Sequence, residues 1–214
     1  MNKVKLDISM SLDGFVAGPN PTLEDPLGKG GEQLHEWIVG LASWREPHGR
    51  TGGERNADDD LVREGRESTG AVIMGRRMFS GGSGPWEQDP RSRGWWGDEP
   101  PFHAPVFVLT HHERETVPKE GGTSYNFVTD GIESALAQAR EAAGDGDVAI
   151  AGGAATVNQY LAAGLIDELR LHIAPVVLGA GERLLDAVGN FDLEPLGKPS
   201  GTDLVTHVSY RMIR

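Results

Sequence analysis

The 214-residue chain contains no cysteine, and this absence excludes several kinds of site at once. Without a thiol the chain has no disulfide, no thiolate nucleophile and no zinc site that depends on sulfur ligands. The seven histidines lack the spacing of a zinc site, so we expect no bound metal. No apolar run approaches the ~20 residues that a membrane-spanning helix requires. Asp7 interrupts the apolar stretch that a signal peptide would need. We therefore expect a cytoplasmic protein with no membrane partner.

Positive charge is also scarce. Lysine and arginine total 20 against 32 aspartates and glutamates, which gives a net charge of −12. A chain this acidic has no overall field that attracts nucleic acid, so we expect no nucleic-acid partner. An anionic ligand must instead be met by a local cluster of positive side chains and backbone N–H donors. The hydrophobic and charged fractions, 38% and 24%, are ordinary for a globular protein. No repeat or composition break divides the chain, which predicts a single domain over residues 1–214.

Hydrophobic periodicity predicts short strands that alternate with helices. Strands are expected over 3–10, 71–74, 105–110, 125–129, 148–151, 168–177 and 203–213. Helices are expected over 32–46, around 61–62, over 132–143 behind a capping box of Asp130 and Glu133, and from 154 to about 164. Residues 47–60 are expected to form a solvated connection, and residues 80–105 an ordered loop. This order predicts an α/β domain with a mostly parallel sheet, helices on both faces and an antiparallel C-terminal edge.

Three strand ends carry residues suited to an anionic ligand. Gly152-Gly153 follows a buried strand and precedes a helix, whose first N–H groups are free to bind phosphate. Arg76 and Arg77 follow Gly75 at a second strand end, and His111 lies just past a third. Ligands of open α/β sheets bind at the carboxyl ends of the strands. The alternative to a ligand site is that the glycine pair only makes a tight turn and that the two arginines are surface residues that balance nearby acidic side chains.

Five segments, taken together and in order, resemble one family. They are Met10–Gly18, Val72–Phe79, Pro105–Thr110, Ile150–Ala154 and Asp167–Gly181. They resemble the dihydrofolate reductase-like superfamily and, within it, the reductase domain of riboflavin biosynthesis and its stand-alone bacterial relatives. The resemblance implies a three-layer dihydrofolate reductase-like fold and an NADPH-dependent reductase of a small heterocycle. The substrate would be that of a 5-amino-6-(5-phosphoribosylamino)uracil reductase or of a dihydrofolate reductase. The alternative is a non-catalytic NADP-binding protein with the same fold.

The resemblance also implies roles for individual residues. Val16 and Ala17 would line the nicotinamide. The adenosine 2′-phosphate side would be held by Gly75, Arg76, Arg77, Leu109, Thr110 and His111, and the diphosphate by Gly152, Gly153, Ala154, Ala155 and Thr156.

The catalytic and substrate-binding residues are less sharply marked. Asp13, beside the expected nicotinamide site, could position or protonate the substrate, although a turn aspartate that binds backbone N–H groups is the alternative. Glu36 is the nearest candidate for the acidic residue that dihydrofolate reductases carry on their first helix. Trp86, with Trp95 and Trp96, could stack on a flat ring, or could cover the core or a dimer interface. Pro175 and Gly179 lie in a loop that either meets the substrate or simply turns.

Assembly is predicted from the C-terminal strands. These strands are long and rich in β-branched residues, and an uncovered edge invites pairing. We expect a homodimer that uses this edge. The alternative is that the loop 80–104 covers it within one chain.

Overall fold

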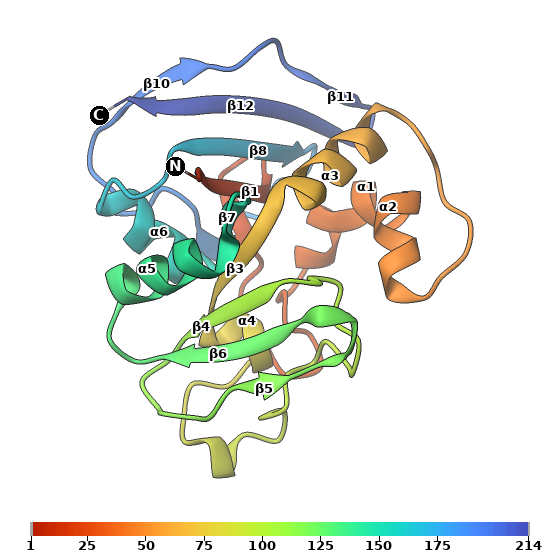
Figure 1. The fold of residues 1–214 in the computed structure, drawn as a ribbon. Coiled ribbons are helices and arrows are strands. Elements are labelled where there is room, and N and C mark those ends of the chain that lie inside the picture. Colours follow the sequence, from red (N-terminus) through yellow and green to blue (C-terminus); the bar gives the residue numbers. More distant parts are fainter. Residues whose placement is uncertain (1, 214) are drawn as a thin grey trace.

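The computed structural model describes residues 2–213, which form a ten-stranded sheet and a separate two-stranded ribbon (Figure 1). The ribbon pairs β2 (Phe15–Ala17) with β9 (Glu182–Arg183). In spatial order, the large sheet consists of β10 (Asp192–Pro195), β12 (Val205–Ile213), β8 (Glu168–Ala174), β1 (Val4–Ser11), β7 (Asp147–Gly152), β3 (Thr69–Gly75), β4 (Pro105–Leu109), β6 (Ser124–Val128) and β5 (Val117–Pro118), with β11 (Ser200–Thr202) paired to β12.

The strand directions agree with the predicted architecture. From β8 to β6, every neighbouring pair of strands is parallel. β12 runs antiparallel to β8, and β10 and β11 run antiparallel to β12. The mostly parallel sheet with an antiparallel C-terminal edge is therefore confirmed. The short strand β5, antiparallel to β6, adds an antiparallel strand at the opposite edge.

Helices cover both faces of the sheet because alternate side chains of each strand point to opposite sides. On β3, Ala71 and Ile73 join the core cluster that contains α5 (Ile132–Ala143) and α6 (Ala154–Ala162). Val72 and Met74 pack on the other face, with Phe79 of α4 (Arg76–Ser80). The longest helices have 12 residues, and within residues 2–213 none is both long and apolar enough to cross a membrane.

The helix predicted over 32–46 is wrong in its continuity. Gly40 ends the first α-helical turn, and Leu41 is extended, with φ −77° and ψ 148°. Leu34, Trp37 and Leu41 are nevertheless buried, so the apolar stripe correctly marked the inward face. The segment consists of four short pieces, η1 (Gly31–His35), α1 (Glu36–Val39), α2 (Ala42–Arg45) and η2 (Glu46–His48).

Two helix starts also differ from the prediction. α3 (Ala57–Ser68) is a full 12-residue helix that begins within the expected connection 47–60. The side chain of its N-cap, Asn56, accepts a hydrogen bond from the Asp59 N–H at 3.0 Å, and three aspartates occupy its first turn. Both features stabilise a helix start. The capping box at α5 is wrong, because the N-cap is Gly131 and no side chain caps the helix.

The tryptophan-rich loop 80–104 is largely irregular, as predicted, with one short turn η3 (Trp86–Gln88). It packs beside β4 and β6, where the rings of Trp86 and Phe127 lie 4.8 Å apart. A further turn, η4 (Glu120–Gly122), lies between β5 and β6. The C-terminal edge, where the short strands β10 and β11 pair along β12, is at the opposite end of the molecule (Figure 1). The strands predicted to leave an uncovered edge are both interior, because β8 lies between β1 and β12, and β12 lies between β8 and the strands β10 and β11. The alternative in which this loop covers that edge is therefore wrong.

A buried polar chain joins α3 to the C-terminal half of the sheet. His172 and His207 face each other through their Nδ1 atoms at 2.6 Å. His207 Nε2 lies 3.1 Å from Asp58 Oδ1, and His172 Nε2 binds the Asp7 carboxylate. Trp37 packs on both imidazoles, with centroid distances of 4.7 and 5.0 Å. A second proton between the two Nδ1 atoms would set two N–H groups against each other. Burial and the His172 ring accordingly lower the pKa of His207.

Candidate active site

A large cavity lies where the parallel strands end. Its volume is about 1860 Å³, more than the roughly 300–1,000 Å³ of a typical small-molecule site. The ends of β3, β4, β6 and β7 all line it, as expected for an open α/β sheet. The cavity can therefore hold a dinucleotide beside a second small molecule.

Every residue predicted to bind the cofactor lines this one cavity. The strand-end residues are Gly75, Arg76, Arg77, Leu109, Thr110, His111, Gly152, Gly153, Ala154, Ala155 and Thr156, joined by Val16 and Ala17 from the ribbon strand. The sequence thus identified correctly which segments meet, although the contacts join residues up to 140 positions apart in the chain, from 16 to 156.

The glycines at two strand ends are explained by what surrounds them. A Cβ on Gly75 would lie 2.4 Å from Thr156 Oγ1, so only glycine lets α6 approach β3 this closely. A Cβ on Gly153 would meet no protein atom within 4 Å, although Gly153 lines the cavity and is the N-cap of α6. Gly153 therefore leaves space that a ligand can occupy at the start of this helix. The Gly152–Gly153 peptide bond is cis.

Two helices present their N-termini to the cavity. α6 begins at Ala154, and α5 begins at Ile132 behind Gly131; all three residues line the cavity. Neither helix has a side-chain cap, so the first N–H groups of each are available to a ligand. Tyr160 of α6 donates a hydrogen bond to the Ile132 carbonyl at 2.9 Å, which holds the two starts together. Paired helix N-termini favour an anionic ligand such as a diphosphate.

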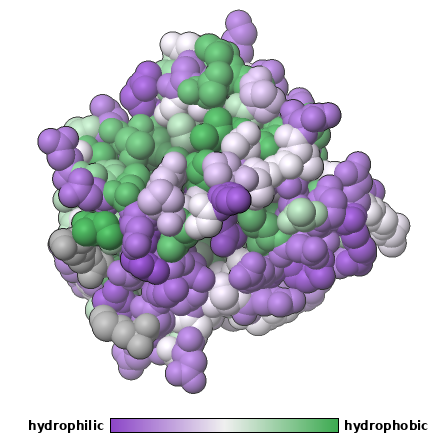
Figure 2. All heavy atoms as spheres, turned by 90° about the horizontal axis from the view of Figure 1, so that it is seen from above, coloured by the Kyte–Doolittle hydropathy of each residue, from purple (hydrophilic) through white to green (hydrophobic). Residues whose placement is uncertain are grey.

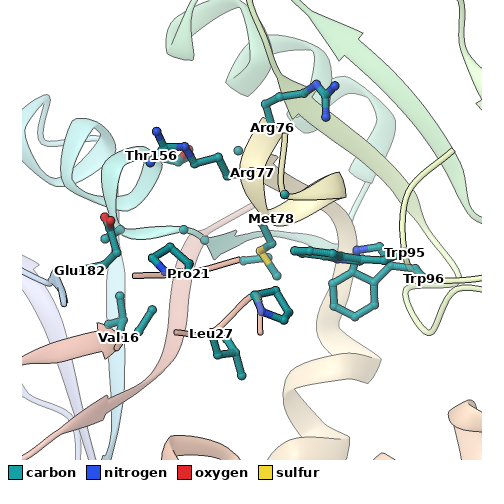
Figure 3. A pocket seen from close by; sticks show the side chains of 18 of the residues that line it. Val16, Pro21, Leu27, Arg76, Arg77, Met78, Trp95, Trp96, Thr156 and Glu182 are labelled. Atoms are coloured by element: carbon teal, nitrogen blue, oxygen red, sulfur yellow. The ribbon is translucent and has the colours of Figure 1, made fainter. Parts of the chain in front are cut away.

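The two arginines of α4 differ in what they bind. Arg76 is buried; its guanidinium pairs with Asp89 at 2.5 Å, binds Ser80 and lies 3.6 Å from the Trp86 ring centre. Arg77 is exposed, and Figure 3 shows it beside Thr156, whereas the Arg76 guanidinium points away from the labelled apolar residues. The structure therefore separates two arginines that the sequence left as equal candidates, and leaves Arg77 the more available to a ligand.

Asp13, Pro175 and Gly179 do not line the cavity among residues 2–213. The two carboxylate oxygens of Asp13 accept hydrogen bonds from the N–H groups of Leu178 and Gly179, at 3.1 and 2.7 Å. A hydrogen bond from Ser11 and these backbone bonds lower the pKa of Asp13, which keeps the carboxyl ionised and opposes proton donation. The structure therefore places Asp13 in a turn that joins two loops, which favours the alternative to a catalytic role, and places Pro175 and Gly179 outside the cavity lining.

The three tryptophans of the loop differ in whether they line the cavity. Trp86 does not line the cavity among the described residues; its Nε1 donates to the His112 carbonyl at 3.0 Å, and its ring packs in an aromatic cluster. Its predicted substrate role is corrected to a packing role. Trp95 and Trp96 line the cavity and lie beside Met78 (Figure 3). The sequence offered all three as candidates for stacking, and only the long-range packing distinguishes them.

Glu36 is the predicted catalytic residue that the structure does place in the cavity. It opens α1 and is exposed. The next residue, Trp37, is buried and donates from Nε1 to Ser9 Oγ at 3.1 Å. This anchor fixes the start of α1 against β1, and Ser9 itself lines the cavity.

Sequence reasoning missed much of the opposite wall. Residues 21–27 contribute to it because the chain closes on itself, with Gly18 N–H bound to the Leu27 carbonyl at 2.7 Å. Gly18 and Gly28 permit this closure, since a Cβ on either would lie within 2.4 Å of backbone. Gly18 and Gly28 were the sequence signal that could have indicated this closure. Other missed lining residues are Glu32, His35, Trp44, His48, Glu99 and Glu182.

Similarity to known proteins assigns the chain to a family. A model of the RibD C-terminal domain matches residues 2–197. The chain belongs to the RibD C-terminal domain family. A Bacillus subtilis relative, the uncharacterized protein YyaP, is 22% identical over 215 residues, which cover 97% of this chain and 94% of YyaP.

Solved structures show the same fold. A protein provisionally assigned to riboflavin biosynthesis in Shewanella sp. PV-4 superposes with a TM-score of 0.62 at 21% identity, over 100% of both chains. A deaminase/5-amino-6-(5-phosphoribosylamino)uracil reductase from Thermotoga maritima gives 0.57 at 16%, over 99% of this chain and 57% of that one. Enterococcus faecalis dihydrofolate reductase, complexed with NADP(H), gives 0.52 at 14%, over 98% and 96%. The RibD C-terminal domain fold of this chain is thus dihydrofolate reductase-like.

Proposed function

We propose that this member of the RibD C-terminal domain family is an NADPH-dependent reductase of a small heterocyclic substrate. One observation carries the proposal: two uncapped helix starts, an open space at Gly153 and the exposed Arg77 all face a single cavity that is large enough for two ligands. Family membership and the NADP(H) complex of the structurally similar dihydrofolate reductase support the same conclusion.

The residues present fit an NADPH molecule along the strand ends. The free N–H groups at the start of α6 would bind the diphosphate, because a helix N-terminus attracts anions. Arg77 and His111, both exposed on the cavity wall, would bind the adenosine 2′-phosphate. Val16 and Ala17 would line the nicotinamide. NADPH would supply the hydride.

The protein's own contribution is orientation and proton supply. Reduction of a C=N or C=O bond adds a hydride to the carbon and one proton to the heteroatom. Glu36 is the predicted acid that reaches the cavity, so we assign it the binding of the ring and the passage of that proton. Trp95 and Trp96 form an aromatic wall that holds a flat ring and excludes water.

Consumption of NADPH absorbance tests this proposal, with a panel of pterins, pyrimidines and quinones as substrates. Steady turnover with at least one of them is expected, and Glu36→Gln should lower kcat while leaving the Kd of NADPH unchanged. Glu141→Gln is the matched control, since Glu141 is an exposed glutamate of α5 outside the cavity lining. Tight NADPH binding without turnover of any substrate would favour the alternative, a non-catalytic NADP-binding protein.

A further inference from the structure

The cavity wall is acidic apart from the strand-end region. Among the described residues that line it, the charged side chains other than histidines are four glutamates and two arginines, and none is a lysine. Both arginines are adjacent on α4, and the guanidinium of Arg76 is already paired with Asp89. The remaining wall, formed by segments 21–49 and 81–101, contributes Glu32, Glu36 and Glu99.

These three glutamates are uncompensated. All three are exposed, and within residues 2–213 none of them forms an ion pair. The basic residues closest in sequence do not supply the missing charge. Near Glu32 and Glu36, Lys29 and Arg50 lie outside the lining, and Arg45 donates its guanidinium to the Thr51 carbonyl. Near Glu99, Lys119 binds the Gly97 carbonyl and Asp98, and the Arg91 guanidinium lies 5.7 Å from the Trp95 ring centre; neither residue is part of the lining.

This arrangement opposes a phosphorylated substrate. A phosphate monoester carries about −1.5 to −2 charges at neutral pH and is usually bound by arginine or lysine. Three carboxylates on a stretch of wall whose lining contributes no lysine or arginine repel it instead. A carboxylate offers only acceptors to its ligand. Trp44, Trp95 and Trp96 add flat apolar surface to the same wall. The chemistry that fits is a flat ring with N–H or amino donors.

We infer that the substrate is a planar nitrogen heterocycle that presents N–H donors and carries no phosphate. The inference rests on the proposed reductase function and names its substrate class. It separates this chain from the Thermotoga maritima protein, whose name specifies a phosphoribosylamino substrate. The phosphates in this cavity belong to the cofactor, along the strand ends, and the glutamate and tryptophan wall receives the ring.

Two ligands that differ only in a phosphate test the inference directly. The probes are 5-amino-6-(5-phosphoribosylamino)uracil and its dephosphorylated ribosyl form, with 2,4-diaminopyrimidine as a smaller phosphate-free ring. Each is titrated calorimetrically into the full-length protein saturated with NADP⁺, so that no reaction occurs. We expect the dephosphorylated form to bind about tenfold or more tightly than its phosphorylated twin, the size of one lost or opposed charge-assisted contact. Equal or tighter binding of the phosphorylated form overturns the inference, as does failure of both phosphate-free rings to bind.

Charge reversal on the wall supplies a second, independent measurement. Glu99→Lys places a cation in the cavity wall and should raise affinity for the phosphorylated probe about tenfold. Glu141→Lys makes the same change in net charge at an exposed position of α5 outside the lining and should leave that affinity unchanged. Equal effects of the two variants would show that only the overall charge matters and would overturn the inference. Titration with NADP⁺ alone judges the proposed function separately, because it does not involve this wall.

Discussion

The adjacent arginines at the start of α4 allow cofactor recognition to be separated from folding. Arg77 is exposed on the cavity wall, so Arg77→Ala should remove the proposed contact to the 2′-phosphate and little else. A charge-assisted hydrogen bond contributes about 1.5–3 kcal/mol, so NADPH should bind about ten- to hundredfold more weakly. NADH lacks the 2′-phosphate, so its Kd should stay close to the wild-type value.

Arg76→Ala should act on stability instead. The variant leaves the Asp89 side chain, only 2% exposed, without its cation. Loss of one partner of a buried ion pair costs about 3–5 kcal/mol, a large share of the roughly 5–15 kcal/mol that stabilises a typical domain. Urea unfolding should therefore show a marked loss for Arg76→Ala and almost none for Arg77→Ala.

Calorimetric titration of each variant with NADPH and NADH, together with the urea curves, provides the assay. Arg50→Ala, an exposed arginine outside the cavity lining, controls for net charge. The assignment is refuted if Arg77→Ala keeps the NADPH preference of the wild type while Arg76→Ala loses it and remains stable.

Three further predictions concern the glycine turn, acid stability and assembly. Gly153→Val fills open space at a φ of −74°, so NADPH binding should be lost while the free energy of unfolding changes by about 1 kcal/mol or less. Normal NADPH binding by this variant would show that the glycine pair only forms a turn. Because the pKa of His207 is lowered, the unfolded chain takes up a proton that the folded protein refuses, so stability should fall as pH drops below 6.5. His207→Gln should flatten that part of the profile in urea melts, and a wild-type profile that is already flat there would contradict the linkage. We also propose a twofold dimer over the exposed edge strands β10 and β11, on the face of Figure 2 where hydrophobic and hydrophilic surface are mixed. A sedimentation-equilibrium mass of 23.0 kDa, that of one chain, would exclude it.

The sheet and the cofactor wall could be predicted because their signals are local. Each buried strand is a short apolar run or alternation, and each is followed by residues suited to a strand end, such as Gly75-Arg76-Arg77 or Gly152-Gly153. Parallel strands bring such ends to one edge of the sheet, whatever the connections between them. A periodic pattern and a topology rule therefore brought three strand ends to one cavity, and the family resemblance added Val16 and Ala17.

The errors arise where tertiary contacts decide. Arg76 and Arg77 are equivalent in sequence, and the contacts of Arg76 with Ser80, Trp86 and Asp89 distinguish them. Trp86 differs from Trp95 because its indole N–H reaches the His112 carbonyl. Asp13 lies outside the cavity lining, and its carboxylate accepts hydrogen bonds from the N–H groups of Leu178 and Gly179, which are 165 and 166 residues further along the chain. In contrast, the start of α3 had a readable signal, Asn56 before three aspartates, which the sequence reading passed over.

The central claim is that the strand-end cavity is an NADPH site. Calorimetric titration of the wild-type protein with NADPH, and then with NADH at the same salt concentration, tests it most directly. The account predicts one NADPH per chain and an affinity about ten- to hundredfold above that of NADH, the contribution of one charge-assisted contact to the 2′-phosphate. Equal dissociation constants for the two nucleotides, or no binding of NADPH, would contradict it.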